Sequence, residues 1–303
     1  MKHGHGRTTE HGGDLDRAIS RFGGKRADWL DLSTGINPHA YPLPPLDNSL
    51  WTDLPDKNLQ QDVEAAAAAA YQTTRRCLAL AGAQQAIQFY PALFAKHFKS
   101  RRARLLYPSY NEHERQLLRQ NWQVERICST ERLAGADLAV VVNPNNPDGR
   151  YSRPEQLLYL AERVGVLVID ESFCDPLPNL SVCPHLTAQH DNILVLRSFG
   201  KFYGLAGLRL GFAVGARPYL DDLAEMIGSW AVSGPALAVG SSALTDRIWK
   251  RQMTTQLATE SFQLDQLAIQ AGWQIVGGTS LYRLYQMDDA ATSQDHLARH
   301  QIW

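Results

Sequence analysis

The chain has 303 residues and a formal net charge of −1, so it is long enough to bury a sizeable core in one large domain and a smaller one. The balanced charge argues against nucleic acid or an acidic membrane as a partner, and no apolar run is long enough to span a bilayer. The polar N-terminus lacks the apolar stretch of a secretory signal, which favours a cytoplasmic location.

The N-terminal segment 1–50 is rich in glycine, proline and histidine. We expect an arm with one short helix over Asp14–Phe22 rather than a domain. A cluster of His3, His5 and His11 could suggest a metal site. Because other ligands are missing nearby, histidines of a flexible arm are the favoured interpretation, and we expect no metal.

Apolar, β-rich runs alternate with helical patterns through the middle of the chain, after an alanine-rich stretch at Ala65–Ala70 that predicts a helix. The predicted strands are Cys77–Leu80, Arg104–Tyr107, Leu138–Val142, Val166–Asp170, Ile193–Leu196 and Leu210–Val214. The predicted intervening helices are Gln84–Phe98, Asn111–Gln120 and Pro154–Arg163. This alternation predicts an α/β fold with a mixed, mostly parallel sheet between helices.

The pattern becomes helical after about Arg217 and continues to Leu267, with a break at Gly234-Pro235. A strand pair over Trp273–Val276 and Ser280–Tyr285 then predicts a small α+β domain. We therefore divide the chain into three parts. They are an N-terminal arm (1–50) that contributes to the small domain, a large domain (51–216), and connecting helices with a partial small domain (217–303).

The four cysteines are scattered and form no C-x-x-C pair. This usage is typical of reduced thiols in a cytoplasmic protein. We expect core or semi-buried thiols at Cys77, Cys128, Cys174 and Cys183. A disulfide between Cys174 and Cys183 is the less favoured alternative.

A serine and a lysine three residues apart, Ser198 and Lys201, lie in a glycine-rich run that continues to Arg209. A lysine amine can form a Schiff base with the aldehyde of pyridoxal 5'-phosphate (PLP), while a hydroxyl and a guanidinium hold its phosphate. Taken alone, Ser-x-x-Lys more often marks a helix cap and a surface lysine. The glycines, Arg209 and the motifs upstream favour a PLP site with Lys201 as its catalytic lysine.

Two features upstream suit the same cofactor. Asp170 ends the apolar run 165–169, so we expect its carboxylate at the C-terminal edge of a buried strand, where open α/β sheets bind ligands. There it could keep the pyridine nitrogen of PLP protonated, although a helix N-cap is a second interpretation. Ala83 and Gln84 follow Gly82 at a predicted strand–helix junction, where backbone N–H groups bind phosphate well.

These motifs occur in the order typical of the aspartate-aminotransferase-like, or fold type I, PLP-dependent enzymes, which the chain resembles over nearly all of its large domain. The resemblance implies that Tyr110 stacks on the pyridine ring and that Asn146 donates to the phenolate oxygen of the cofactor. Two positions depart from that family. Phe173 replaces a tyrosine that donates to the same oxygen, and Leu54 replaces a tyrosine that reaches the cofactor phosphate of the neighbouring subunit.

The opening His11-Gly12-Gly13 and the segment 32–38 resemble more narrowly the threonine-phosphate decarboxylases of cobalamin biosynthesis. This resemblance implies substrate contacts from four residues: His11, Gly12, Gly35 and Asn146. Gly35 stands where those enzymes have asparagine, so only its backbone could contact the substrate.

The resemblance also implies that the arginines that bind the substrate lie beyond Trp303, since Arg283 and Arg299 do not match them. We therefore expect a truncated small domain, and a chain that binds PLP yet turns over poorly. The family builds its site between two subunits, which implies a homodimer.

The resemblance implies a PLP-dependent carbon–carbon lyase that decarboxylates O-phospho-L-threonine to (R)-1-amino-2-propanol phosphate. One alternative is an aminotransferase for a phosphorylated amino acid such as histidinol phosphate. Another is a catalytically silent PLP-binding protein. The motifs do not distinguish decarboxylation from transamination, because both reactions start from the same adduct of substrate and cofactor.

Overall fold

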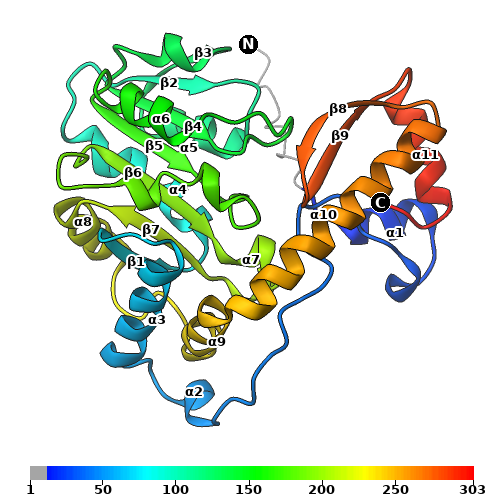
Figure 1. Cartoon of the computed structure of the whole chain (residues 1–303), viewed down its shortest axis with the longest axis horizontal. Coiled ribbons are helices and arrows are strands. Elements are labelled where there is room, and N and C mark those ends of the chain that lie inside the picture. The colour runs from blue at the N-terminus through cyan, green and yellow to red at the C-terminus, as the bar shows by residue number, and fades with distance from the viewer. Residues whose placement is uncertain (1–11) are drawn as a thin grey trace, which may run out of the picture.

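The computed structural model describes residues 12–303, and its centre is a seven-stranded sheet (Figure 1). The strands are β1 (Arg76–Leu80), β2 (Arg102–Leu106), β3 (Gln123–Ile127), β4 (Leu138–Val142), β5 (Val166–Asp170), β6 (Ile193–Ser198) and β7 (Gly211–Gly215). Their order across the sheet is β1-β7-β6-β5-β4-β2-β3. β7 is antiparallel to both of its neighbours, and the remaining pairs are parallel. The mixed, mostly parallel sheet predicted from the sequence is confirmed.

The central strands are buried on both faces, which explains why they are continuous apolar runs rather than alternating ones. In β5, Leu167 and Ile169 belong to one core, whereas Val166 and Val168 belong to the other. One face is covered mainly by α4 (Ala83–Ala95), α5 (Asn111–Arg119) and α8 (Arg217–Ile227). The other face is covered by α3 (Lys57–Ala70), α6 (Pro154–Ala161), α7 (Phe199–Phe202) and α9 (Gly234–Thr245).

A long helix, α10 (Arg247–Gln270), leads away from the sheet to a smaller lobe (Figure 1). This lobe holds the antiparallel pair β8 (Gln274–Thr279) and β9 (Tyr282–Gln286), the helix α11 (Ala290–Arg299), and the N-terminal helix α1 (Leu15–Phe22). Its small core includes Leu15, Trp29 and Ala298. The N-terminal arm and the C-terminal end of the chain meet there, where Leu30 pairs with Ile302.

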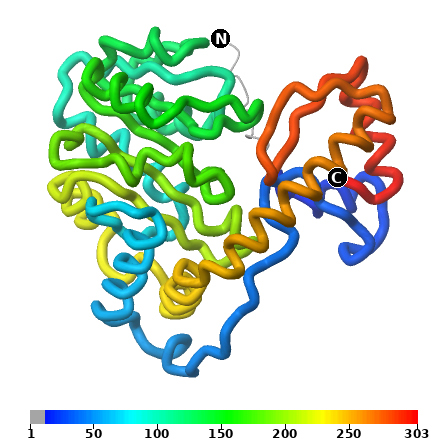
Figure 2. Tube along the Cα trace, viewed as in Figure 1, coloured from blue at the N-terminus to red at the C-terminus, as the bar shows by residue number. Residues whose placement is uncertain are grey.

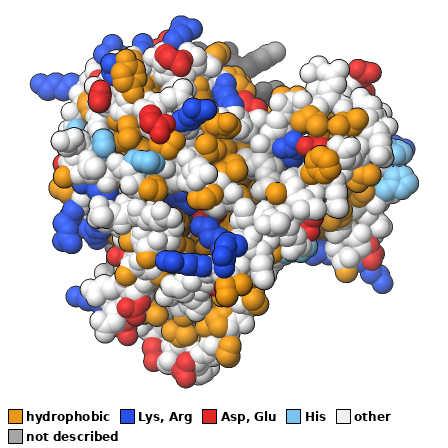
Figure 3. Space-filling view, viewed as in Figure 1, with side chains coloured by type: hydrophobic (Ala, Val, Ile, Leu, Met, Phe, Trp, Pro, Cys, Tyr) orange, Lys and Arg blue, Asp and Glu red, His pale blue; other side chains and the backbone are white. Residues whose placement is uncertain are grey.

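The arm then returns from the smaller lobe to the sheet and passes the short helix α2 (Ser49–Thr52) (Figure 2). Hydrophobic side chains remain exposed on the smaller lobe (Figure 3), where Phe262, Leu267 and Val276 are each more than half exposed.

Most predicted elements have observed counterparts, and some observed elements were not predicted. The predicted break in the helical pattern is present at 228–233, between α8 and α9, and Gly234-Pro235 forms the first turn of α9, where proline is well accommodated. The strand β3 was not predicted, since Gln123–Ile127 is a polar, mostly exposed edge strand. The helix α11 was also missed, because its sequence is largely polar and small.

The four cysteines are free, and the less favoured Cys174–Cys183 disulfide is absent. Cys77, Cys174 and Cys183 are buried as expected, and burial raises the pKa of Cys77 to about 12. Cys128 is exposed rather than semi-buried. Within residues 12–303, no helix combines the length and the apolar character needed to cross a membrane.

Candidate active site

A cavity of about 590 Å³ opens at the C-terminal edge of the parallel strands. Ten of the site residues predicted from the sequence line it: Gly12, Gly35, Ala83, Gln84, Tyr110, Asn146, Asp170, Ser198, Lys201 and Arg209. The eleventh, His11, lies outside the described residues, as do His3 and His5. The structure therefore brings together residues that are up to 197 positions apart, from Gly12 to Arg209.

Lys201 lies in α7, the short helix that follows β6, and the N-terminal arm fixes its backbone. The Asn37 N–H donates to the Lys201 carbonyl (2.9 Å), and the Asn37 side-chain amide donates to the Phe202 carbonyl (2.8 Å). Burial lowers the pKa of the Lys201 amine, Asp170 opposes this shift, and Arg209 adds to it. The net lowering favours the neutral, nucleophilic amine.

Asp170 is buried at the end of β5 and accepts hydrogen bonds on both carboxylate oxygens. Oδ2 lies 2.9 Å from His113 Nε2, and Oδ1 accepts from the Ser172 N–H (2.9 Å) and the Ser172 hydroxyl. Burial alone would raise the pKa of Asp170, but the bonds from His113 and Ser172 outweigh it and hold the pKa below its ordinary value. Asp170 is therefore ionised in the buried site.

His113, which was not predicted as a site residue, is buried in the core beside Asp170. Its Nδ1 is 3.1 Å from the hydroxyl of Tyr90. Burial, and then the charge of Asp170, raise the pKa of that hydroxyl, so it stays protonated and donates to Nδ1. The proton of His113 then sits on Nε2 and points at Asp170. The available signal was the i,i+3 spacing from Tyr110, the N-cap residue of α5, and the two rings do contact edge to edge, with centroids 6.1 Å apart.

The loop before α4 brings a guanidinium against a helix N-terminus. Gly82 has φ +83°, and a Cβ there would lie 2.8 Å from Arg209 Nη2, so only glycine lets the arginine approach. Arg209 itself adopts the left-handed conformation, with φ +57°. The first N–H groups of α4, at Ala83 and Gln84, the Arg209 guanidinium and the nearby Ser198 hydroxyl make a suitable cradle for a phosphate.

A polar chain connects the aromatic wall of the cavity to α5. The Tyr110 hydroxyl donates to Gln84 Oε1 (3.2 Å), and Gln84 Nε2 donates to Glu112 (3.1 Å). Burial raises the pKa of Tyr110 to about 12, with smaller contributions from Glu112 and Asp170. The tyrosine ring is thus held at the cavity by its own hydroxyl.

One wall of the cavity is formed by α5, whose residues were not predicted as part of the site. Four of its residues line the cavity at the spacing i, i+3, i+4, i+7: Glu112, Arg115, Gln116 and Arg119. This spacing marks one face of a helix and could have been read from the sequence once Tyr110 was placed at the helix start. By contrast, Arg283 pairs with Asp265 within the smaller lobe and does not line the cavity.

The asparagine-rich turn after β4, residues 143–149, presents Asn146 to the cavity, because its two other asparagines donate hydrogen bonds to the backbone of neighbouring segments. Asn143 donates to the Ser152 carbonyl (3.1 Å), and Asn145 donates to the Pro108 carbonyl (2.9 Å). Elsewhere on the cavity wall, a Cβ on Gly35 would lie 2.7 Å from Phe173 Cε1. With Phe173 in this position, only the backbone at Gly35 fits.

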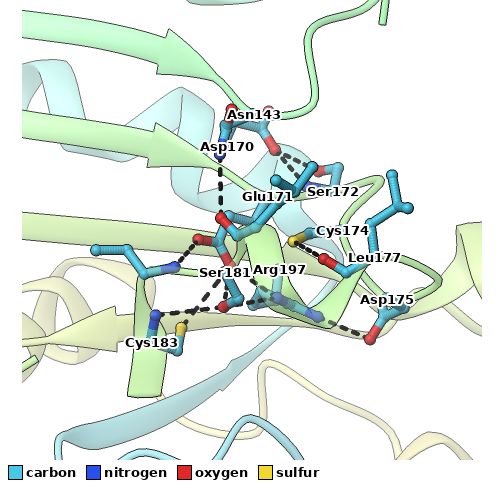
Figure 4. A network of polar contacts seen from close by, with 12 residues as sticks. Asn143, Asp170, Glu171, Ser172, Cys174, Asp175, Leu177, Ser181, Cys183 and Arg197 are labelled. Carbon is cyan, nitrogen blue, oxygen red and sulfur yellow. Dashed lines mark hydrogen bonds and ion pairs between the residues drawn. The ribbon is translucent and has the colours of Figure 1, made fainter. Parts of the chain in front are cut away.

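Behind the cavity, a buried ionic network fixes the loop after β5 (Figure 4). Arg197 in β6 donates to Glu171 through Nη1 and to Asp175 through Nη2, both at 2.7 Å. Burial opposes the charge of Arg197, but Asp175 and Glu171 overcome it and raise the pKa of the guanidinium well above its ordinary value. Ser181 donates to Glu171 as well (2.6 Å), so the network holds the loop that carries Asp170 and Phe173.

Comparison with known proteins agrees with this geometry. Residues 28–302 match the family described as aminotransferase class I and II. The chain belongs to this family. Among curated members, the threonine-phosphate decarboxylase of Pseudomonas aeruginosa is 41% identical over 97% of this chain and 88% of its own length. The enzyme of the same name from a Sinorhizobium species is 40% identical over 96% of this chain and 88% of its own length.

Histidinol-phosphate aminotransferases are more distant from this chain in sequence. A histidinol-phosphate aminotransferase of Trichormus variabilis is 32% identical over 51% of this chain and 44% of its own length. The crystal structure of the histidinol-phosphate aminotransferase from Clostridium acetobutylicum superposes with a TM-score of 0.76 and 17% identity, over 90% of this chain and 88% of that one. The superposition shows the shared fold.

Proposed function

We propose that this chain is a PLP-dependent lyase that decarboxylates O-phospho-L-threonine to (R)-1-amino-2-propanol phosphate, a precursor of the cobalamin side chain. The observation that carries the proposal is the 41% identity to a threonine-phosphate decarboxylase over 97% of the chain. The cavity by itself suits either this reaction or transamination, because both need the same cofactor residues.

The cavity residues fit PLP group by group. Lys201 Nζ is the amine that would bond the cofactor's aldehyde carbon, and the cradle of Ser198, Arg209 and the first amides of α4 would hold its phosphate. Asp170, kept ionised by its hydrogen bonds, would pair with the pyridine nitrogen. Tyr110 would stack on the ring, and Asn146 would donate to the phenolate oxygen.

When bound, PLP supplies an aldehyde that takes the substrate amine and a pyridinium ring that accepts the electron pair of a broken Cα bond. The chain's contribution is charge and position. Asp170 would maintain the proton of the pyridine ring, while Gly12, Gly35 and Asn146 line the cavity where the substrate's anionic groups would bind. Lys201 Nζ or a water molecule would return a proton to Cα after decarboxylation.

The decisive experiment gives the protein PLP and O-phospho-L-threonine carrying a labelled carboxylate. Release of labelled carbon dioxide together with the phosphorylated amine, without need for 2-oxoglutarate, supports the proposal. Lys201→Ala should abolish release, whereas Lys96→Ala, which changes an exposed lysine paired with Asp222, should not.

Other outcomes favour the alternatives. Amine transfer that requires 2-oxoglutarate would identify an aminotransferase, a reaction named for relatives that share about half of the chain. Bound PLP with neither reaction would identify a catalytically silent cofactor-binding protein.

We also propose that the chain forms a homodimer, as its resemblance to fold type I enzymes implies, and that it is cytoplasmic, as its scattered cysteines and polar N-terminus indicate. Sedimentation of the purified protein with and without PLP tests the dimer. A monomer under both conditions would overturn it.

A further inference from the structure

Tyr282 in β9 contacts three separate parts of the cavity wall. Its hydroxyl donates to the carbonyl of Asn145 (2.5 Å), next to the predicted cofactor contact Asn146. Its ring packs edge-on against Phe173, with centroids 4.7 Å apart and an interplanar angle of 71°. A Cβ on Gly35 would lie 3.4 Å from its Cδ1. One side chain of the smaller lobe thus joins the arm, the turn and the loop after β5.

The backbones of the turn and the β8–β9 hairpin also touch. A Cβ on Gly149 would lie 2.3 Å from the Gly278 carbonyl oxygen, and a Cβ on Gly277 would lie 2.1 Å from the Asp148 carbonyl oxygen. Any side chain at Gly149 or Gly277 would push the two segments apart. Glycines on both sides therefore let the hairpin dock directly on the turn, which brings the Tyr282 hydroxyl within reach of Asn145.

The carbonyl of Asn145 is the point at which the turn is held. It accepts from the Gly149 N–H (2.7 Å), which closes the turn, and from Tyr282. Burial raises the pKa of the Tyr282 hydroxyl, and the charges of Asp148 and Asp170 raise it further, so the hydroxyl remains a donor. The side chain of Asn145 is fully buried and bonded to Asp148 (2.7 Å), so the turn has little freedom once Tyr282 is in place.

We propose that Tyr282 is a positioning residue: through Asn145 and Phe173 it sets the turn that presents Asn146 and the wall beside Lys201. This inference rests on the proposed PLP site. It implies that the placement of the smaller lobe is coupled to cofactor binding, since loosening the hairpin would free the turn that presents Asn146 to the cavity.

The same strand offers a matched control. Tyr285, three residues further along β9, donates its hydroxyl to Asp265 on α10 (2.8 Å), within the smaller lobe. Tyr282→Phe and Tyr285→Phe therefore remove the same atom from the same strand, but only the first removes a bond to the turn. Tyr282→Phe keeps the ring that packs on Phe173, so the change is confined to one hydrogen bond.

The experiment measures three quantities for the wild type and both variants. Tyr282→Phe should raise the dissociation constant of PLP about five-fold, as expected for one neutral hydrogen bond, and Tyr285→Phe should not. It should also move the pH midpoint of the bound cofactor's absorbance change upward, because a weaker donor at the phenolate oxygen leaves the proton shared with Lys201 harder to remove. In cofactor-free protein, the Gly149 amide should exchange faster with solvent.

Gly277→Ala is the second test, because its Cβ would displace the hairpin while leaving Tyr282 intact; it should reproduce all three changes. Unchanged affinity and spectrum in Tyr282→Phe, or equal changes in Tyr285→Phe, would overturn the positioning role. If the wild type binds no PLP, the proposed function fails. The exchange rate of Gly149 then still decides whether Tyr282 holds the turn, and an unchanged rate would refute that too.

Discussion

Asp170 and Glu171 are neighbours at the end of β5 and both are buried, yet their surroundings differ in kind. Glu171 forms a salt bridge with the Arg197 guanidinium. It also accepts hydrogen bonds from the Ser181 hydroxyl and from the Val182 N–H (2.7 Å). Among residues 12–303, Asp170 forms no salt bridge with an arginine or a lysine, and it accepts instead from the neutral ring of His113 and from Ser172. The charge of Glu171 is therefore compensated inside the fold by Arg197, whereas the charge of Asp170 remains available to a cofactor.

We therefore expect substitutions on the two sides of this strand end to affect different properties of the protein. On the cavity side, substitutions should impair activity and leave folding nearly intact. On the network side, substitutions should impair folding and leave the activity of the folded fraction nearly intact.

The largest effect is expected for Asp170→Asn, which keeps the shape of the side chain and removes its charge. Activity per bound cofactor should fall roughly 100- to 1,000-fold, as for the loss of a preorganised electrostatic contact in other active sites. The midpoint of unfolding should change less than on the network side, because the amide oxygen can still accept from Ser172 and the amide NH2 can donate to His113 Nε2 once the ring proton moves to Nδ1. Turnover and urea unfolding of the same preparation test both halves, and near-normal turnover would exclude the role of Asp170.

The opposite outcome is expected for Arg197→Met. Removing the guanidinium leaves Glu171 and Asp175 buried without their main counter-charge, which typically costs about 3–5 kcal/mol of unfolding free energy. Turnover per folded molecule should stay within a few-fold of the wild type. Stability equal to the wild type would show that the network does not hold this loop.

An intermediate effect is expected for His113→Phe, which removes the donor to Asp170 but not the charge. A hydrogen bond to a charged group is worth about 1.5–3 kcal/mol, so activity should fall roughly 10- to 100-fold. The pKa of Asp170 should rise at the same time, because His113 is the main group that lowers it against burial. Tyr90→Phe, which removes only the outer link of the chain, should have a smaller effect on both quantities.

His113 also illustrates how far the sequence could predict this site. The residues that carry a recognisable local signal were predicted: Lys201 and Arg209 lie in a glycine-rich run, and Asp170 ends an apolar strand. They line one cavity because the ends of parallel strands meet at one edge of the sheet. For His113 the local signal is only its i,i+3 spacing from Tyr110, since its partners Tyr90 and Asp170 are 23 and 57 positions away.

The fold shows the same division between local and distant information. The strands β4 and β5 were predicted to the residue, because burial on both faces leaves a continuous apolar run. The contact between Tyr282 and Asn145 could not be predicted, because it depends on the docking of a hairpin 137 positions away. Gly149 and Gly277 permit this docking, but nothing in the sequence marks them out. Their role is visible only in the structure, where each lies against the backbone of the other segment.

The smallest effect concerns pH. Because the folded-state pKa of Asp170 is lowered, its ionised form stabilises the native state at pH values above its unfolded pKa of about 4. That contribution is lost as the pH falls below this value through the folded pKa, where the unfolded chain binds a proton more readily. The unfolding free energy of the cofactor-free protein, measured by urea between about pH 3 and pH 6, should therefore decrease more steeply on acidification than that of Asp170→Asn. Equal slopes for the two proteins would mean that burial offsets the bonds from His113 and Ser172 so that the pKa of Asp170 is not lowered, and the contrast with Glu171 would lose its electrostatic basis.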